Sequence, residues 1–350
     1  MEIIQIAATY SVTALSIFLI SVFFTGLAIV FFPKIGFLDR PEKYSLKRDP
    51  IPYYGGLAIF AAFLVSVLLF VPLSWEVAGL LFASAIIVGL GFLDDREGLS
   101  PFLRLSVQFI AALVLVISGI GILSVNLPFV GVLDFSTIII GGVMVLSAFF
   151  TILWVMTILN VMNFLDGVSG LNSGVTFVAG LTLFFLSIHP GIHENPQSQV
   201  AVASLALVVS MVALGFLIFD FPKPKILMGD TGSTFLGFIL AALAIFSGGK
   251  VATAFIVLGV PILDMIWVVV RRIINGQPFW KGDLKHLHHR FLEIGFREDK
   301  VVWMYLGLSA VFGLFAILLV SSLQKFFVII ALLILMLILG ALLVFMPKKK

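Results

Sequence analysis

Eleven long apolar segments, separated by short polar connections, constrain the fold of this 350-residue chain more than any other feature. A helix that crosses a bilayer needs about 20 mostly apolar residues, and backbone polar groups inside a bilayer are satisfied only in helices or closed barrels. We therefore predict an all-α, polytopic integral membrane protein that forms a single membrane-embedded domain over residues 1–350. The expected transmembrane helices are 8–32, 53–73, 77–93, 105–123, 137–158, 171–188, 199–219, 232–248, 251–271, 302–321 and 326–346.

The composition agrees with this interpretation. Hydrophobic residues make up 61% of the chain and charged residues 11%, whereas a soluble domain carries about 25% charged residues. The chain has no cysteine, which excludes disulfide and thiolate chemistry. The net charge of +3 is small, and we expect no nucleic-acid partner. The first apolar segment lacks the basic start and the cleavage site of a removable signal, so we expect it to remain as the first span.

The distribution of basic residues predicts the orientation. Of the 21 Lys and Arg residues, all but Lys250 and Lys325 fall in or beside one of the two alternating sets of connections. The positive-inside rule places that set in the cytoplasm, with the N-terminus outside and the C-terminus cytoplasmic. We expect a multi-pass protein of the inner or plasma membrane, with catalytic loops on the cytoplasmic face at 33–52, 94–104, 159–170, 220–231 and 272–301.

An adjacent pair of carboxylates, Asp94 and Asp95, stands where the third apolar segment ends. Adjacent carboxylates repel each other, and they stay ionised beside a cation or in ample water. The simplest interpretation is a solvated helix end that Arg96 neutralises. We favour a functional site because further polar segments also stand at the ends of apolar runs.

The second polar segment places Asn160, Asn163 and Asp166 at three-residue intervals. On a helix this spacing aligns the three side chains along one face. Amide and carboxylate oxygens in such a row are suited to a hard cation or a sugar. A helix C-cap explains Gly167 but leaves the row of three polar side chains unexplained.

Two more acids belong to later segments. Asp230 opens the eighth span in the sequence Gly229–Ser233. A helix N-cap is a strong alternative for it, but an Asp beside free N–H groups at a helix N-terminus also suits a metal and a phosphate, and both roles can hold together. Asp264 lies inside the ninth span, where an acid indicates function unless it pairs with a neighbouring cation.

Three of the five histidines of the chain fall within four residues, at His286, His288 and His289, followed by Arg290. In a helix, His286, His289 and Arg290 would share a face, with His288 off it. Zinc is one interpretation, but the spacing is tight and an arginine would repel the metal. A cationic cluster that binds phosphoryl oxygens fits better.

The first cytoplasmic loop and the fourth span add cations. Lys43, Lys47 and Arg48 could hold a phosphate, or they could contact anionic lipid, and the sequence favours neither. Arg104 and Gln108 follow one turn apart at the start of the fourth span, where interfacial anchoring is the simpler role.

Together these residues are of the types that phosphoryl transfer uses, a reaction in which catalysis depends on positioning and charge neutralisation. The oxygen ligands suit Mg²⁺ or Mn²⁺. Cations together with a divalent metal suit a diphosphate. Because the polar segments lie at the membrane surface, we expect a soluble nucleotide as one substrate and a lipid as the other.

The motifs, in this order, give the chain a resemblance that covers nearly its whole length. The carrying motifs are Asp94-Asp95 followed by Leu99-Ser100-Pro101, Asn160-x-x-Asn163-x-x-Asp166-Gly167, Gly229-Asp230-Thr231-Gly232-Ser233, Pro261-x-x-Asp264 and His286-x-His288-His289-Arg290. The chain resembles the polyprenyl-phosphate N-acetylhexosamine-1-phosphate transferases, in the WecA/TagO-like branch of the superfamily that includes phospho-MurNAc-pentapeptide translocase.

The resemblance implies a reaction. N-acetylhexosamine-1-phosphate, with GlcNAc-1-phosphate as the expected group, passes from a UDP-sugar to undecaprenyl phosphate, UMP leaves, and a polyprenyl-diphospho-sugar forms with Mg²⁺ at the first membrane step of cell-envelope glycan synthesis. A phospho-MurNAc-pentapeptide-type transferase and an ion-coupled transporter are the alternatives. The family also allows a homodimer.

The resemblance also assigns roles to residues. Asp230 and Asn163 would hold the metal, and Asp94 or Asp95 would keep the lipid phosphate deprotonated. Asp166, which is counted with Asp94 and Asp95 among the catalytic residues, would hold the nucleotide or sugar. The expected substrate-binding residues are His286, His288, His289, Arg290, Asn160, Lys43, Arg104 and Asp264.

The chain departs from the family pattern at several positions. Tyr44, Ser45 and Lys47 stand where Arg, Lys and His are expected, and Ser169 replaces a frequent second Asp. The changes in the first loop affect the expected grip on the sugar or lipid, whereas the metal site and the acidic pair are intact.

Overall fold

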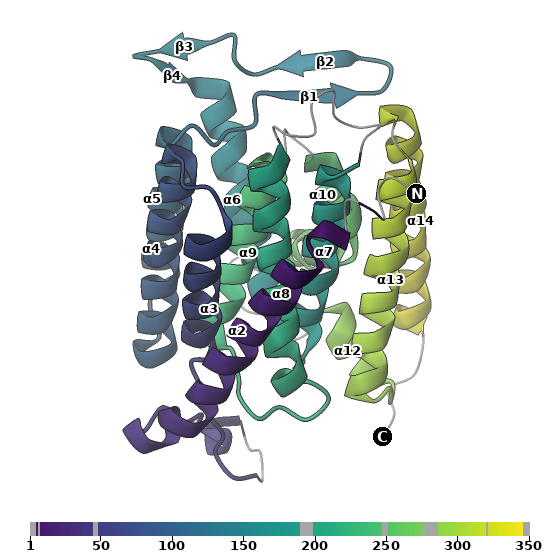
Figure 1. Ribbon diagram of the computed structural model, residues 1–350. Helices are drawn as coiled ribbons and strands as arrows, with labels where there is room; N and C mark the ends of the chain where they lie inside the picture. Colours follow the sequence, from purple (N-terminus) through teal and green to yellow (C-terminus); the bar gives the residue numbers. More distant parts are fainter. Residues whose placement is uncertain are drawn as a thin grey trace.

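Helices dominate the computed structural model, which describes residues 5, 8–44, 48–189, 199–246, 251–274, 276, 286–319 and 321–345. They make up 76% of the structure and run side by side in a bundle (Figure 1). The α-helices are α2 (Ser11–Phe31), α3 (Gly55–Phe70), α4 (Trp75–Glu97), α5 (Pro101–Ile117), α6 (Val145–Leu165), α7 (Leu171–Ser187), α8 (Val200–Asp220), α9 (Gly229–Phe246), α10 (Val251–Val257), α11 (Gly259–Ile274), α12 (Leu287–Glu293), α13 (Glu298–Leu318) and α14 (Ser322–Phe345). Two short 3₁₀ helices, η1 (Phe32–Ile35) and η2 (Pro41–Tyr44), lie in the first loop.

The helices confirm an integral membrane protein. Within the described residues, seven helical segments are long and apolar enough to cross a bilayer, and α3, α5 and α7 are shorter apolar helices. Each of the eleven expected spans overlaps a helix, or for 251–271 a pair of helices. The number of crossings and the orientation remain predictions.

Helix α9 lies at the centre of the bundle and packs against α6, α4, α3 and α7. An 18-residue stretch of α9 is 89% buried, whereas the corresponding stretch of α14 is 11% buried and faces outward. Glycines permit the close packing of α9. A Cβ on Gly56 would lie 2.2 Å from the backbone nitrogen of Gly232, and one on Gly91 would lie 2.5 Å from the Cα of Thr231. The N-terminus of α9 is therefore wedged between α3 and α4.

The expected span 137–158 is wrong at its start, because the chain forms two β-hairpins before α6 begins at Val145. Strand β1 (Ser124–Leu127) pairs antiparallel with β2 (Gly131–Asp134), and β3 (Ile139–Ile140) pairs with β4 (Val143–Met144). The second hairpin has a physical cause in Gly141-Gly142, where both residues have positive φ, as a two-residue hairpin turn requires. The hairpins lie across the end of the bundle (Figure 1). The fold is thus mostly, not wholly, α-helical.

The ninth expected span, 251–271, is two helices instead of one. Helix α10 ends at Val257 and α11 begins at Gly259. Pro261 lies in the first turn of α11, where the missing N–H of proline costs little because those N–H groups have no intrahelical partner. Proline here starts a new helix, which brings Asp264 into its second turn.

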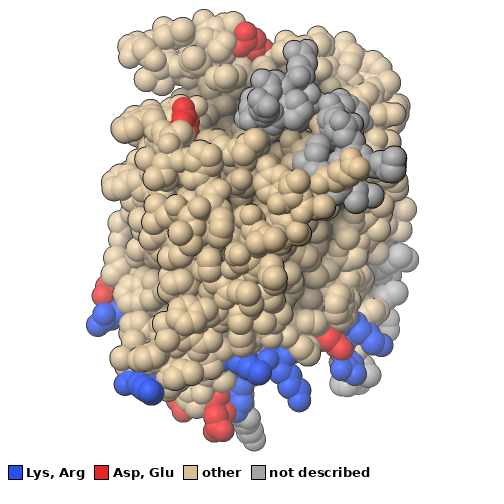
Figure 2. Space-filling view, in the orientation of Figure 1, with Lys and Arg blue, Asp and Glu red and all other residues tan. Residues whose placement is uncertain are grey.

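Charged side chains gather at the other end of the bundle from the hairpins. Figure 2 shows nearly all the visible lysines and arginines in a band at this end. The band agrees with the sequence prediction that one set of connections carries the basic residues.

Candidate active site

The C-terminal ends of α4 and α6 meet the N-terminal end of α9 at the charged end of the bundle (Figure 1). Helix α4 carries Asp94 and Asp95 in its last turn, α6 carries Asn163, and α9 begins with Gly229 and Asp230. The structure therefore brings together the acidic pair and the two expected metal ligands, although Asp95 and Asp230 are 135 residues apart in the sequence.

Asp95 caps α9 across the helix interface. Its Oδ1 accepts hydrogen bonds from the backbone N–H of Asp230 (2.8 Å) and the hydroxyl of Tyr53 (2.8 Å). Its Oδ2 accepts hydrogen bonds from the backbone N–H of Thr231 (2.9 Å) and the Thr231 hydroxyl (2.6 Å). Each carboxylate oxygen has about two acceptor sites, so these four bonds occupy Asp95. Burial raises the pKa of Tyr53, the carboxylate of Asp95 raises it further, and the phenol stays a donor.

Gly229 makes this cap possible. It has a φ of +69°, which favours glycine, and a Cβ there would lie 2.5 Å from Oδ2 of Asp95. A larger residue would both strain the backbone and displace the carboxylate. The Gly-Asp-Thr sequence is therefore needed for the backbone to approach Asp95.

Asp94 has a different environment. Its Oδ1 accepts a hydrogen bond from the backbone N–H of Leu99 (2.7 Å), and its Oδ2 lies 2.8 Å from Nε of Arg104. Nη1 of Arg104 also lies 3.7 Å from Oδ2 of Asp230. Arg104 thus bridges two carboxylates that interact with each other. Asp94 can still accept further hydrogen bonds, whereas the acceptor sites of Asp95 are all occupied.

Ser100 and Pro101 hold Arg104 in this position. Ser100 is the N-cap of α5 and accepts a hydrogen bond from the backbone N–H of Leu103, with Pro101 in the first helical position. This is a favourable helix start. It places Arg104 one turn into α5, facing the acids.

Asn160 and Asn163 of α6 contact side chains of the helices on either side of the site. Nδ2 of Asn163 donates to Oδ1 of Asp230 and to Oγ of Ser233, both at 3.0 Å. Nδ2 of Asn160 donates to Oε1 of Gln108 (3.0 Å) and to the carbonyl of Met156 (2.7 Å). Gln108 is buried, with 3% of its surface exposed, so its expected role as an interfacial anchor is wrong: it orients Asn160.

Asp166 ends α6 and begins a tight turn that meets the histidine segment. A Cβ on the next residue, Gly167, would lie 2.7 Å from Nε2 of His288 and 3.0 Å from Nε2 of His289. Burial raises the pKa of Asp166, and the carboxylates of Asp220, Asp230 and Asp95 raise it further. The turn after α6 and the histidine segment at α12, far apart in sequence, therefore share one wall of the site.

Asp220, which no sequence motif had marked, holds the same turn in place. Its Oδ2 accepts hydrogen bonds from the backbone N–H of Gly170 and the hydroxyl of Ser173, both at 2.9 Å. Gly170 is the N-cap of α7. Asp220 thus caps α7 as Asp95 caps α9.

Asp264 caps a third helix. Its Oδ1 accepts a hydrogen bond from the backbone N–H of Leu287 (2.8 Å), the first residue of α12, and its Oδ2 lies 3.4 Å from Nδ1 of His286. Asp264 is 3% exposed. The expectation that it binds substrate directly is corrected: a buried carboxylate in this position holds the helix that carries the histidines.

His288 also departs from its expected role. Its side chain has no exposed surface, and burial, together with His289 and His286, lowers its pKa to about 2. A neutral, enclosed imidazole does not bind a phosphate as a cation. His286 is nearly as buried, whereas His289 and Arg290 are partly exposed, so these two remain the candidates for contact with a substrate.

Some expected site residues lie outside what the structure describes. The side chains of Lys43 and Tyr44 and the whole of Ser45 and Lys47 are outside the described residues. Arg48 is described, and its guanidinium pairs with Asp39, whose Oδ1 also accepts a hydrogen bond from the backbone N–H of Ile51 (2.8 Å). Arg48 and Asp39 therefore brace the first loop.

The donor set at Asp230 and Asn163 fits Mg²⁺. Mg²⁺ prefers oxygen ligands, keeps several waters, and is bound through one or two carboxylates and substrate phosphates. Among the described residues no group of three or more His, Cys, Asp and Glu side chains is placed to hold a metal. Asp230 is the more accessible carboxylate, with 37% of its side chain exposed, against 5% for Asp94.

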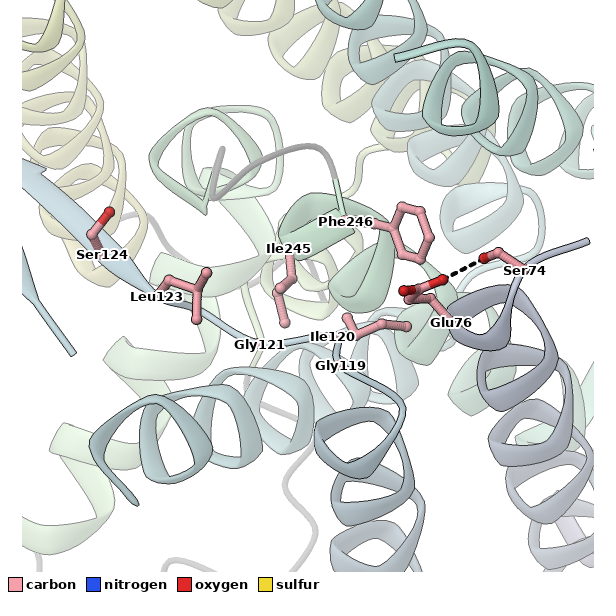
Figure 3. A pocket seen from close by; sticks show the side chains of 9 residues that line it. All are labelled: Ser74, Glu76, Gly119, Ile120, Gly121, Leu123, Ser124, Ile245 and Phe246. Atoms are coloured by element: carbon pink, nitrogen blue, oxygen red, sulfur yellow. Dashed lines mark hydrogen bonds between the residues drawn. The ribbon is translucent and has the colours of Figure 1, made fainter. Parts of the chain in front are cut away.

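A cavity of about 470 Å³ lies at the opposite end of the bundle. Its lining includes Ser74 and Glu76 at the start of α4 and Leu123 and Ser124 beside β1 (Figure 3). Among the described residues that line the cavity, Glu76 is the only charged one, and it accepts a hydrogen bond from Ser74. It lacks the cations and paired carboxylates of the polar site, so the active-site candidate remains at the charged end.

The fold and the site define a multi-helix integral membrane protein with an acidic and cationic cluster at one end of its helices. Residues 77–248 match the family described as glycosyl transferase family 4. The "Probable undecaprenyl-phosphate N-acetylglucosaminyl 1-phosphate transferase" of Bacillus subtilis is 31% identical over 328 residues, which cover 92% of this chain and 87% of that protein. The decaprenyl-phosphate N-acetylglucosaminephosphotransferase of Mycobacterium tuberculosis is 30% identical over 324 residues, covering 83% and 78%.

A third relative is more distant in sequence. The undecaprenyl-phosphate alpha-N-acetylglucosaminyl 1-phosphate transferase of Escherichia coli is 27% identical over 306 residues, covering 82% of this chain and 78% of that protein. The chain belongs to the polyprenyl-phosphate N-acetylhexosamine-1-phosphate transferase family, as the motifs of its sequence predicted.

Proposed function

We propose that the protein transfers GlcNAc-1-phosphate from UDP-GlcNAc to undecaprenyl phosphate and releases UMP. The activities for which the relatives are named support this reaction. The observation that carries it in this chain is the convergence of Asp94, Arg104, Asp230 and Asn163 at one end of the bundle. Carboxylates, an amide and a guanidinium so arranged suit a diphosphate and a divalent cation.

The chemistry requires one bond to form and one to break. An oxygen of the lipid phosphate attacks the β-phosphorus of the nucleotide sugar, the bridging P–O bond breaks, and its electron pair leaves with UMP. Asp94 is the better candidate to keep the attacking phosphate deprotonated, because Asp95 is occupied by four hydrogen bonds. We assign Asp95 to positioning.

The remaining residues bind and orient. Asp230 and Asn163 would hold Mg²⁺, for which Mn²⁺ could substitute, and the ion would neutralise charge on the diphosphate. Arg104, His289 and Arg290 would contact phosphoryl oxygens. Asp166 would hold the nucleotide or sugar, and Gln108 would keep Asn160 oriented toward it. The site would face the cytoplasm, where the nucleotide sugar is found.

UMP release by the purified protein tests the proposal. The assay contains undecaprenyl phosphate, Mg²⁺ and UDP-GlcNAc, with other UDP-N-acetyl sugars and UDP-MurNAc-pentapeptide in parallel. We expect UMP with UDP-GlcNAc, dependence on the lipid and on Mg²⁺, and loss of turnover in Asp230→Asn at an unchanged melting temperature. UMP release with another donor alone would keep the reaction and change the assigned donor sugar. Full activity of Asp230→Asn, or no UMP with any donor, would overturn the proposal.

A further inference from the structure

The β3–β4 hairpin presents apolar side chains outward at the end of the bundle opposite the active site. Ile139 is 60% exposed, Ile140 66% and Val143 45%. Between residues 118 and 148 the chain has a single charged residue, Asp134, whose carboxylate is held by the backbone N–H and hydroxyl of Ser136. A connection that extended into water would carry polar and charged side chains, so this composition needs an explanation.

The position of the hairpin indicates what covers it. In Figure 1 the β3–β4 hairpin lies beyond the end of α6 and reaches the edge of the bundle above the end of α5. In a bilayer this edge of the helical bundle would face lipid. The lipid-facing side of α5 is exposed as well, with Ile117 67% exposed in its last turn. Trp75, at the start of α4, is 70% exposed at this end of the bundle, and tryptophan is enriched at membrane interfaces. The apolar hairpin is thus continuous with the lipid-facing surface.

The backbone of the hairpin limits how deep it can lie. Each sheet has two strands, so each strand leaves one edge unpaired. Unpaired N–H and C=O groups are not tolerated in the hydrocarbon core, where nothing can hydrogen-bond with them. At the boundary between headgroups and acyl chains, water and headgroups satisfy the backbone while the apolar side chains enter the acyl region.

We propose that the β3–β4 hairpin is an interfacial membrane anchor, with Ile139, Ile140 and Val143 inserted at the headgroup–acyl boundary of the leaflet opposite the active site. The β1–β2 hairpin has a different position. The ring of Phe129 at its turn contacts Phe326 of α14, so it crosses the end of the bundle and connects the α6 side to α14. The β1–β2 hairpin thus lies across the end of the helical bundle, whereas the β3–β4 hairpin contacts lipid.

The absence of cysteine from the chain allows a direct test. A spin label at Ile140→Cys is compared in proteoliposomes with labels at Ile117→Cys on the lipid-facing side of α5 and at Lys300→Cys, which is exposed in the first turn of α13. Power saturation gives the accessibility of each label to oxygen, which concentrates in lipid, and to a water-soluble nickel complex. We expect Ile140→Cys to give an oxygen-to-nickel ratio several-fold above that of Lys300→Cys and below that of Ile117→Cys.

Three results would overturn the proposal. A ratio equal to that of Lys300→Cys would mean that the hairpin lies in water. A ratio equal to that of Ile117→Cys would mean that it lies in the core, against the backbone argument. Dipolar broadening that disappears on dilution with unlabelled protein would mean that a second copy covers the hairpin. UMP release, measured on the same labelled proteins, shows that they are folded and is independent of the depth result.

Discussion

The carboxylate of Asp95 accepts a hydrogen bond from the backbone N–H of Asp230, so the end of α4 caps the helix that carries the most accessible acid of the site. Asp220 does the same for α7, and Asp264 does so for α12. A negative charge at a helix N-terminus is favourable, because it meets free N–H groups and the positive end of the helix dipole. Three acids of the polar end therefore fix helices in place.

The asparagine variants of the two neighbouring aspartates should differ: Asp95→Asn should mainly lose stability, and Asp94→Asn should mainly lose activity. Asp95→Asn places an NH₂ group against the N–H donors of α9, so we expect the free energy of unfolding to fall by about 1–3 kcal/mol. Asp94→Asn removes a charge beside Arg104 and should reduce UMP release by roughly 10²–10⁴-fold, with the smaller change in melting temperature. Thermal unfolding in detergent and the UMP assay measure both. Equal loss of stability in the two variants would contradict this division of roles.

Two glycines on α4 form a matched pair for the packing of α9. A Cβ on Gly91 would lie 2.5 Å from Cα of Thr231, whereas a Cβ on Gly89 would have nothing within 4 Å. Gly91→Ala should cost about 1–3 kcal/mol through overpacking and should disturb the cap on Asp230. Gly89→Ala should be neutral or slightly stabilising, since alanine favours a helix by about 1 kcal/mol. Melting temperatures that rank the two variants in the opposite order would contradict the close packing of the α9 N-terminus against α4.

His288 should make the protein sensitive to acid. Its pKa is lowered to about 2 in the folded protein, against about 6.5 when unfolded, so below pH 6.5 the unfolded chain binds a proton that the folded protein does not. Stability is then lost as pH falls, by about 1.4 kcal/mol between pH 7.5 and 5.5. The melting temperature of His288→Leu should fall less over this range than that of the wild type. Parallel curves for the two proteins would exclude His288 as the cause.

Asp264 should act on substrate binding through α12. Asp264→Ala leaves the N–H of Leu287 without its acceptor, so we expect His289 and Arg290 to lose their positions and the KM for the nucleotide sugar to rise by about tenfold, a change worth about 1.4 kcal/mol. Asp264→Asn keeps an oxygen for this N–H and should restore most of the loss. If the asparagine variant is as impaired as the alanine variant, the charge itself is needed and the capping explanation is insufficient.

The sequence predicted the helical membrane fold, and it singled out most of the residues that meet at the candidate site, because both depend on local patterns. Apolar runs mark helices, and polar residues at their ends mark a shared surface. The first hairpin lies in the connection between the expected spans 105–123 and 137–158, where no strands were predicted. The second was missed because the apolar run 137–144 was assigned to a span, although the Gly141-Gly142 pair was a turn signal. The division of labour between Asp94 and Asp95 could not be read from adjacency, since it depends on the approach of Thr231 from 136 residues away. Gln108 and Asp220 were undervalued because their partners lie on other helices.

The cap between α4 and α9 also has a consequence for biogenesis. During synthesis α4 enters the membrane long before α9 exists, and Asp95 stays without the backbone donors that lie 135 residues further along the chain. Until α9 arrives, the acidic pair must remain hydrated at the membrane surface, which keeps the end of α4 from sinking into the bilayer. The capped end of α9 and the candidate active site beside it are therefore completed only after α9 has been synthesised.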